Sequence, residues 1–142
     1  MTNIYEQGLA RNQANYAPLT PLSLLSRVER VYPDHPAVIH GKLCYSWRQT
    51  TERCRRLASA LVKRGIGRGD TVAIIAPNTP AIFEAHFGVP MAGAILNALN
   101  IRLDAATLSF ILEHGEAKAV ITDSEFSPLM RSVLENASRD LL

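Results

Sequence analysis

The sequence of 142 residues lacks most of the motifs by which a class of enzyme or ligand-binding protein is recognised. Its two cysteines, Cys44 and Cys54, match neither a zinc site nor a redox motif in their spacing. The net charge of +2 is too small to indicate a polyanionic partner, so we expect no nucleic acid. No HExxH, GxSxG or GxxxxGK motif followed by Ser or Thr occurs. These absences argue against a zinc protease, a serine hydrolase of the elbow type and a P-loop nucleotidase.

Long apolar runs are also missing. The longest apolar stretch, residues 89–99, is interrupted by Pro90, Gly93 and Asn97, which argues against a membrane-spanning helix. No basic and apolar signal peptide opens the chain. We therefore expect a reduced, cytoplasmic setting.

The chain does contain a regular succession of helical and strand patterns, after a polar start that predicts a loosely ordered segment over 1–17. Two short strands at 37–39 and 43–45 flank a turn at Gly41, which predicts a hairpin. Helices are expected at 21–32, 46–64, 81–91, 105–114 and from 128 to about 136, with further strands at 71–76, 94–99 and 119–122. Strands that alternate with helices at this spacing pair in parallel through crossovers. The predicted fold class is α/β, a Rossmann-like parallel sheet with crossover helices, in one unit over 18–142.

Capping residues support these helix boundaries. Thr20, Ser46 and Thr79 each precede a helical pattern, and Ser46 with Gln49 fits a capping box. The strand at 71–76 is continuously apolar, which predicts that helices cover both of its faces.

The glycine-rich stretch at 65–70 resembles a dinucleotide fingerprint only in composition. A phosphate-binding GxGxxG loop follows a strand and opens a helix. Here the glycines follow a helix and precede a strand, and Asp70 takes the sixth position. We interpret them as a structural turn, and the arrangement argues against a dinucleotide-binding enzyme.

Polar residues at the opposite ends of the strands are better placed for a ligand, because open α/β sheets bind ligands outside the carboxyl ends of their strands. Asn78 and Thr79 follow the first parallel strand, and Asn97, Asn100 and Arg102 lie within or after the next. Two amides and a guanidinium could contact a carboxylate or a phosphate. They could equally satisfy loop backbone, and Thr79 could serve only as a cap. We find no catalytic residue and no metal ligand set.

Charge is unevenly distributed along the chain. Residues 1–71 carry 11 Lys or Arg against 5 Asp or Glu, whereas residues 72–142 carry 4 against 8. Much of the excess lies on the helix at 46–64. Its basic face could meet a polyanion, or it could be solvated or paired with acidic residues elsewhere in the chain.

An ordered series of motifs then resembles a known family. The segment LCYSW at 43–47 opens the basic helix, RGIGRGDTVAIIAPNTP follows at 64–80, and LNALNIRL at 96–103 precedes another helix. Over residues 18–126 this series resembles the N-terminal part of the AMP-forming acyl-activating enzymes, most closely the short- or medium-chain fatty-acid–CoA ligases. The resemblance implies an incomplete N-terminal portion of the large adenylate-forming domain.

The resemblance also implies an activity for the complete enzyme. Such ligases convert a carboxylic acid and ATP, with Mg²⁺, into an acyl-adenylate, from which coenzyme A then displaces AMP. The family's Ser/Thr/Gly-rich phosphate loop, its nucleotide-binding motifs and its C-terminal domain with the adenylation lysine have no counterpart here. We therefore expect an N-terminal fragment that is inactive alone and self-associates through exposed sheet edges. The alternative is a non-catalytic module that pairs with a full-length synthetase or a polyanion through helix 46–64.

Overall fold

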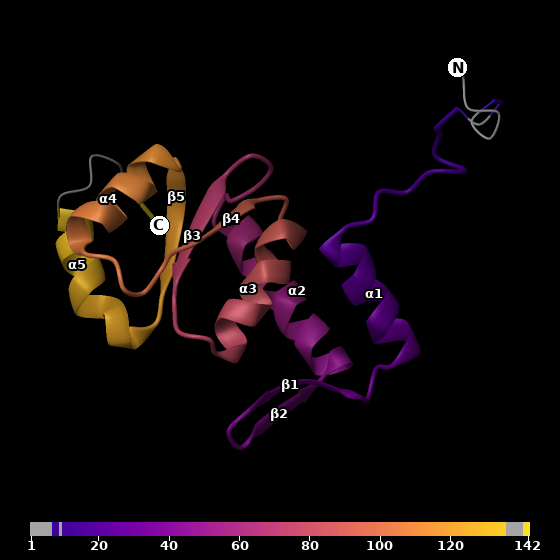
Figure 1. Ribbon diagram of the computed structural model, residues 1–142, viewed down its shortest axis with the longest axis horizontal. Coiled ribbons are helices and arrows are strands. Elements are labelled where there is room, and N and C mark those ends of the chain that lie inside the picture. Colours follow the sequence, from indigo (N-terminus) through magenta and orange to yellow (C-terminus); the bar gives the residue numbers. More distant parts are fainter. Residues whose placement is uncertain (1–6, 9, 136–140) are drawn as a thin grey trace.

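The protein forms a three-layer α/β body in the computed structural model, which describes residues 7, 8, 10–135, 141 and 142. The elements in chain order are α1 (Pro21–Val31), β1 (Pro36–His40), β2 (Leu43–Ser46), α2 (Trp47–Lys63), β3 (Thr71–Ile75), α3 (Pro80–Met91), β4 (Ile95–Ala98), α4 (Ala105–His114), β5 (Ala117–Thr122) and α5 (Ser127–Glu135), with a short 3₁₀ turn at Ser124–Phe126. Figure 1 shows α2 and α3 on one side of the sheet and α4 and α5 on the other.

The main sheet has the strand order β4-β3-β5, and both pairings are parallel. Thr71 of β3 lies opposite Ile95 of β4 and opposite Ala117 of β5. The hairpin of β1 and β2 forms a separate, antiparallel sheet. The predicted α/β class, parallel pairing and hairpin are therefore confirmed.

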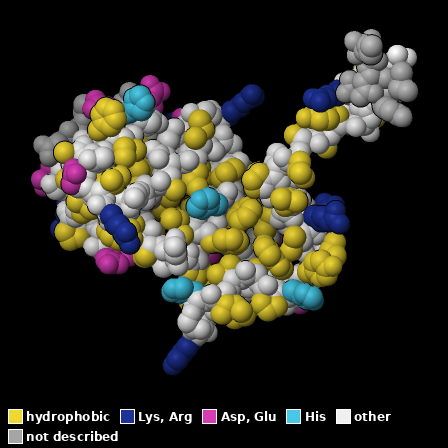
Figure 2. All heavy atoms as spheres, in the orientation of Figure 1, with side chains coloured by type: hydrophobic (Ala, Val, Ile, Leu, Met, Phe, Trp, Pro, Cys, Tyr) yellow, Lys and Arg dark blue, Asp and Glu magenta, His cyan; other side chains and the backbone are white. Residues whose placement is uncertain are grey.

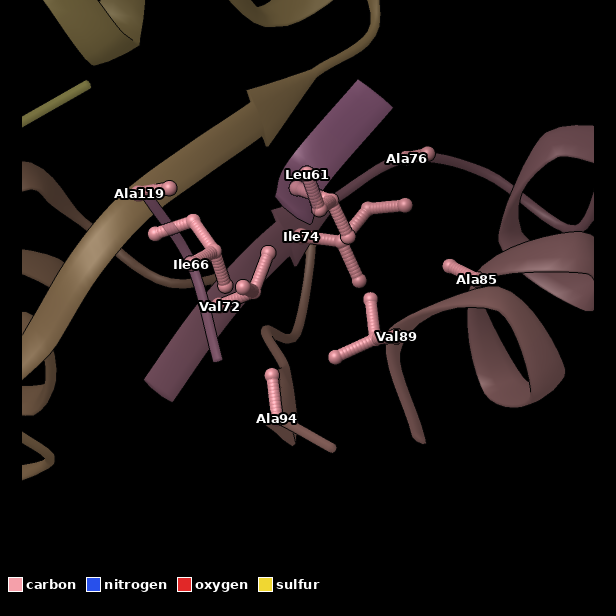
Figure 3. Packing of buried hydrophobic residues seen from close by; sticks show 9 residues of the cluster. All are labelled: Leu61, Ile66, Val72, Ile74, Ala76, Ala85, Val89, Ala94 and Ala119. Carbon is pink, nitrogen blue, oxygen red and sulfur yellow. The ribbon is translucent and has the colours of Figure 1, made fainter. Parts of the chain in front are cut away.

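β3 is the central strand of the main sheet, and all five of its residues are buried. Val72 and Ile74 point to the side of α2 and α3, where Leu61 and Val89 meet them (Figure 3). Ala73 and Ile75 point to the other side and pack with residues of α4 and α5. Because apolar residues do not alternate with polar ones along this strand, both of its faces can be covered by helices.

The outer edges of the sheet differ. On β5, the backbone N–H of Val120 donates to the carbonyl of Leu142 at 3.0 Å, and the N–H of Leu142 donates to Lys118 at 3.1 Å. β4 pairs only with β3 among the described strands. The free edge of β4 therefore presents unpaired backbone groups.

Several boundaries differ from those predicted. β5 begins at Ala117, two residues earlier than its apolar pattern indicated, and α3 begins at Pro80, one residue earlier than predicted, while its end at Met91 agrees with the prediction. The expected end of the last helix near residue 136 lies outside the described residues, as do residues 1–6 and 9 of the segment expected to be loosely ordered.

The described part of the N-terminal segment, from residue 10 to Thr20, contains turns but no helix or strand and extends away from the body in Figure 1. Within the described part of the chain, no helix has the length and apolar character needed to cross a membrane.

Candidate functional site

The glycine-rich turn lies at the amino end of β3. Gly65 ends α2 with φ of 78° and Gly69 has φ of 87°, a left-handed region that favours glycine. The Gly67 N–H donates to the Asp70 carboxylate at 2.7 Å, and Lys118 Nζ lies 3.1 Å from the same oxygen. These two contacts lower the pKa of Asp70. The turn is thus held by its own aspartate, at the edge opposite to the one where ligands of such sheets bind.

The carboxyl end of β3 leads into Asn78 and Thr79, the first pair of candidate residues. Thr79 occupies the N-cap position of α3, but its side chain makes no capping hydrogen bond, so its predicted capping role is wrong. The Thr79 Oγ1 atom is buried without a hydrogen-bond partner in the described structure. The N-terminal amides of α3 therefore have no cap from the Thr79 side chain, in contrast to α1 and α2, where Thr20 and Ser46 each form a capping box.

Asn78 and Thr79 line a cavity of about 750 Å³. Its remaining walls come from the start of α1, from β1 and from α3, and consist of Pro21, Ala37, Val38, Ile39, His40, Pro80, Ile82, Phe83, His86 and Phe87. No Lys, Arg, Asp or Glu lines it. The structure therefore places these two candidates in the wall of a largely apolar pocket, which His40 and His86 also line.

The other three candidates lie apart from this pocket. Asn97 is half-buried within β4, and its side-chain nitrogen stands where a Cβ on Gly115 would come within 2.9 Å. The Asn100 Oδ1 atom accepts the backbone N–H of Arg102 at 3.0 Å and so closes a turn. The Arg102 side chain is exposed after β4 and forms no ion pair among the described residues. Of the three, only Arg102 offers an unused charge.

The basic face of α2 is largely neutralised by ion pairs. Arg55 binds Glu29 of α1 through two contacts of 2.7 and 2.6 Å. Arg53 pairs with the buried Glu84 of α3, and this hydrogen bond raises the pKa of the Arg53 guanidinium. Two further pairs are Arg48 with Asp34 at 3.2 Å and Arg56 with Glu52 at 2.9 Å. Four arginines of this helix are therefore paired within the fold, although only the Arg53–Glu84 pair joins the basic half of the sequence to the acidic half.

The remaining reactive side chains show no catalytic arrangement. Cys54 is fully buried, and burial raises the pKa of its thiol to about 11. The ring Nδ1 of His86, an exposed residue, donates to the Ile82 carbonyl at 2.7 Å. No group of three His, Cys, Asp or Glu side chains gathers as a metal site in the part of the chain that the structure describes.

Sequence reasoning missed two features of this region. One is the ion pair of Glu84, since its partner Arg53 is 31 residues away in the chain. The other is the pocket wall on α3, formed by residues 82, 83, 86 and 87. Spacings of one, three and four residues place side chains on one helix face, so this wall could have been found from the sequence.

Comparisons with known proteins show which family the chain is similar to. The model of the family described as AMP-binding enzyme matches residues 25–141. The chain is 56% identical over 126 residues to the acetate/butyrate–CoA ligase AAE7 of Arabidopsis thaliana, which is named as peroxisomal, and 54% identical over 127 residues to the acetate–CoA ligase CCL3 of Humulus lupulus. Each match covers 89% of this chain and 22% of the relative.

The same fold occurs in solved ligases. A benzoate–CoA ligase from Burkholderia xenovorans superposes with a TM-score of 0.79 at 27% identity, covering 84% of this chain and 24% of the solved one. The chain thus spans about a fifth of the length of the curated relatives it matches.

Proposed function

The chain belongs to the family of AMP-binding enzymes, and from this premise we propose that it supplies the N-terminal scaffold of an AMP-forming carboxylate–CoA ligase and catalyses no adenylation by itself. The observation that carries the proposal is the family match over residues 25–141, in a chain that spans only 22% of the relatives' length. Among the described residues, no group of His, Cys, Asp or Glu side chains could hold a metal. The relatives' names point to a short aliphatic acid as the substrate of the complete enzyme.

ATP, Mg²⁺ and coenzyme A are the proposed co-substrates of that complete enzyme. The carboxyl end of β3 does not fit a nucleotide phosphate, because Pro80 supplies no N–H and the Thr79 hydroxyl is buried. No carboxylate lies in the adjacent pocket to hold Mg²⁺. We assign no step to these groups within the described residues.

Arg102, with Asn100 beside it, remains the best candidate in this chain for contact with an anionic substrate group, because its guanidinium is exposed and forms no ion pair among the described residues. The proposal keeps Asn78, Thr79 and Asn97 as weaker candidates. The division into a loosely ordered segment over 1–17 and a partial AMP-binding domain over 18–142 is part of the same proposal.

The alternative, a non-catalytic module that binds a polyanion through α2, gains no support from the structure, because four arginines of this helix form ion pairs within the chain. For the location of the complete enzyme, the name of AAE7 favours the peroxisome over the cytoplasm predicted from the sequence. We propose the peroxisome.

The proposal is tested by measuring pyrophosphate release from ATP and Mg²⁺ by the purified chain. Acetate, butyrate and benzoate are supplied in turn, with and without coenzyme A. We expect no release above the level without protein, while a complete ligase such as AAE7 serves as the positive control. Carboxylate-dependent turnover by the 142-residue chain would show that it carries an adenylating site.

A further inference from the structure

The outer face of α1 combines exposed apolar side chains with an arginine. α1 lies at the edge of the molecule in Figure 1 and packs on α2 and α3 with its inner side, where Leu25 is buried. On the outer side, Leu24 is 50% exposed and Val31 is 56% exposed. Arg27 lies between them in the sequence, and the spacings of three and four residues place all three side chains along one stripe of the helix. We call Leu24, Arg27 and Val31 the α1 stripe.

Apolar side chains extend the α1 stripe beyond both ends of the helix. Leu19, which precedes the helix, is 83% exposed, and Tyr32, which follows it, is 51% exposed. Figure 2 shows hydrophobic side chains over α1 with Lys or Arg side chains beside them. Exposed apolar side chains that gather in this way mark a surface that meets a partner or a membrane.

The charge of this face is positive. Arg27 and Arg30 are exposed and form no ion pair among the described residues. The next acidic residues along the chain, Glu29 and Asp34, are each paired with an arginine of α2. The described residues from 7 to 28 contain no Asp or Glu. The outer face of α1 therefore complements a negatively charged surface.

The mixture of side chains on the α1 stripe distinguishes between the possible negative surfaces. A soluble polyanion would meet Arg27 but leave Leu24 and Val31 in water. An apolar protein groove would bury the two aliphatic side chains together with the guanidinium between them, which would lose its hydration. At a bilayer surface, by contrast, aliphatic side chains enter the boundary between headgroups and acyl chains, while arginine reaches the lipid phosphates and tyrosine is favoured at the same level.

We propose that α1 binds the surface of a bilayer that contains anionic lipid, with Leu24 and Val31 inserted at the headgroup boundary and Arg27 at the phosphates. The helix lies on the membrane in this arrangement and does not cross it. Such binding does not require ligase activity, so its failure and the failure of the proposed scaffold function are separate results.

α5 provides a matched comparison within the same chain. Leu134 is 42% exposed and Arg131 is exposed on this helix, which packs on the opposite face of the sheet from α2 and α3. The helix ends at Glu135, and a carboxylate at this place opposes binding to an anionic surface. α5 thus carries the same residue types at similar exposure in a less favourable electrostatic setting.

Co-sedimentation of the full 142-residue chain with lipid vesicles tests the proposal. Vesicles of phosphatidylcholine alone are compared with vesicles that also contain phosphatidylserine, at low and at high salt. Protein that sediments without vesicles is measured in parallel and subtracted, because the chain is expected to self-associate. Leu24→Asp is compared with Leu134→Asp, and Arg27→Gln with Arg131→Gln. Circular dichroism verifies that the variants fold, and Leu24→Ser with Leu134→Ser replaces the aspartate pair if Leu24→Asp does not.

We expect the chain to bind the vesicles that contain phosphatidylserine, and to bind them more weakly at high salt because salt screens the attraction. Arg27→Gln should weaken binding about fivefold at low salt, since it removes one cation from the membrane surface. Leu24→Asp should weaken it by roughly tenfold or more, because a charge replaces an inserted apolar side chain. The two α5 variants should bind like the unaltered chain.

Absence of binding to phosphatidylserine vesicles overturns the inference, and so do equal effects of the α1 and α5 variants. Equally strong binding to phosphatidylcholine alone also overturns it, because the arginines would then have no part. Heparin serves as the soluble polyanion. If heparin binds the chain and Leu24→Asp leaves vesicle binding unchanged, α1 is a polyanion site without apolar insertion, and the assignment to a bilayer is wrong.

Discussion

Gly88 lies where the backbone of α3 comes so close to α2 that little room is left for a side chain. A Cβ at this position would stand 2.8 Å from Leu57 Cδ2 and 3.0 Å from the carbonyl oxygen of Cys54. Real Cβ contacts are longer than this, so the two helices would have to separate. The glycine is thus explained by helix packing and not by a turn.

We expect Gly88→Ala to lower the free energy of unfolding by about 1 kcal/mol or more. Overpacking costs about 1–3 kcal/mol, and the better helix propensity of alanine offsets at most about 1 kcal/mol. Urea unfolding followed by circular dichroism measures the change. Gly67→Ala is the control, since nothing lies within 4 Å of its added Cβ and stability should be unchanged. Equal stability of the two variants would show that α2 and α3 tolerate a wider spacing.

The two side chains of the Arg53–Glu84 ion pair differ in their exposure to solvent. The Glu84 side chain is 10% exposed, whereas that of Arg53 is 44% exposed and also lies over the Tyr45 ring at 4.8 Å. Removal of the arginine leaves a carboxylate that water reaches poorly. Removal of the carboxylate leaves a cation that water can solvate.

Arg53→Ala should therefore lower the free energy of unfolding by about 2–3 kcal/mol, and Glu84→Gln by less than about 1 kcal/mol, because glutamine keeps a hydrogen-bond acceptor. Urea unfolding of both variants at neutral pH and low salt provides the comparison. A larger loss of unfolding free energy in Glu84→Gln than in Arg53→Ala would contradict the view that Glu84 is the partner that water solvates poorly.

At the scale of elements, side-chain caps fix where most of the helices begin. The α4 helix starts after Asp104, whose carboxylate accepts the Thr107 N–H at 2.9 Å and lies 3.1 Å from its hydroxyl. The backbone bond first, and then the hydroxyl, lower the pKa of Asp104 below its ordinary value of 3.8. The α3 helix differs from α1, α2 and α4, because Thr79 occupies the same position without forming a side-chain cap.

The lowered pKa gives α4 a pH-dependent contribution. Because the folded pKa of Asp104 lies below its unfolded value, its stabilisation is complete above pH 3.8 and is lost as the pH falls through the folded pKa. Asp104→Asn should retain the cap and lose this share of the acid dependence, while Asp104→Ala should be less stable at neutral pH. Thermal unfolding between pH 2.5 and 7 measures both. If the stability of the Asp104→Asn variant and that of the unaltered chain depend on acid pH in the same way, Asp104 does not cause this dependence.

At the scale of the whole molecule, the two faces of the sheet are covered but one of its edges is open. β4 pairs with β3 alone among the described strands, and Ile95 on it is 56% exposed. Open strand edges promote association between copies. Together with the exposed hairpin, this edge underlies the self-association that the sequence leads us to propose.

We expect the chain to self-associate with rising concentration and Ile95→Lys to weaken that association by roughly tenfold, because a charge on an edge strand opposes pairing. Sedimentation velocity over a range of concentrations measures the shift. Phe110→Asp, which changes an exposed apolar residue away from the sheet, should have no such effect. Association that is insensitive to Ile95→Lys would place the contact on another surface.

The sequence by itself determined the order and type of the elements, the buried position of β3 and the structural role of the glycine turn. These features depend on local interactions: apolar periodicity, caps and the φ preference of glycine act within a few residues of each other. The same local logic was wrong for Thr79, because its side chain is buried against the body of the fold and does not turn back to cap α3.

Only the tertiary structure decided which acidic residues pair with the arginines of α2, why a Cβ on Gly88 would crowd α2, and that Asn78 and Thr79 border a largely apolar pocket while Asn97 lies apart from it. Each of these depends on residues far apart in the chain, such as Arg53 with Glu84 or Ile39 with Phe83. Their proximity is set by how the helices pack on the sheet, a property that no short stretch of sequence encodes.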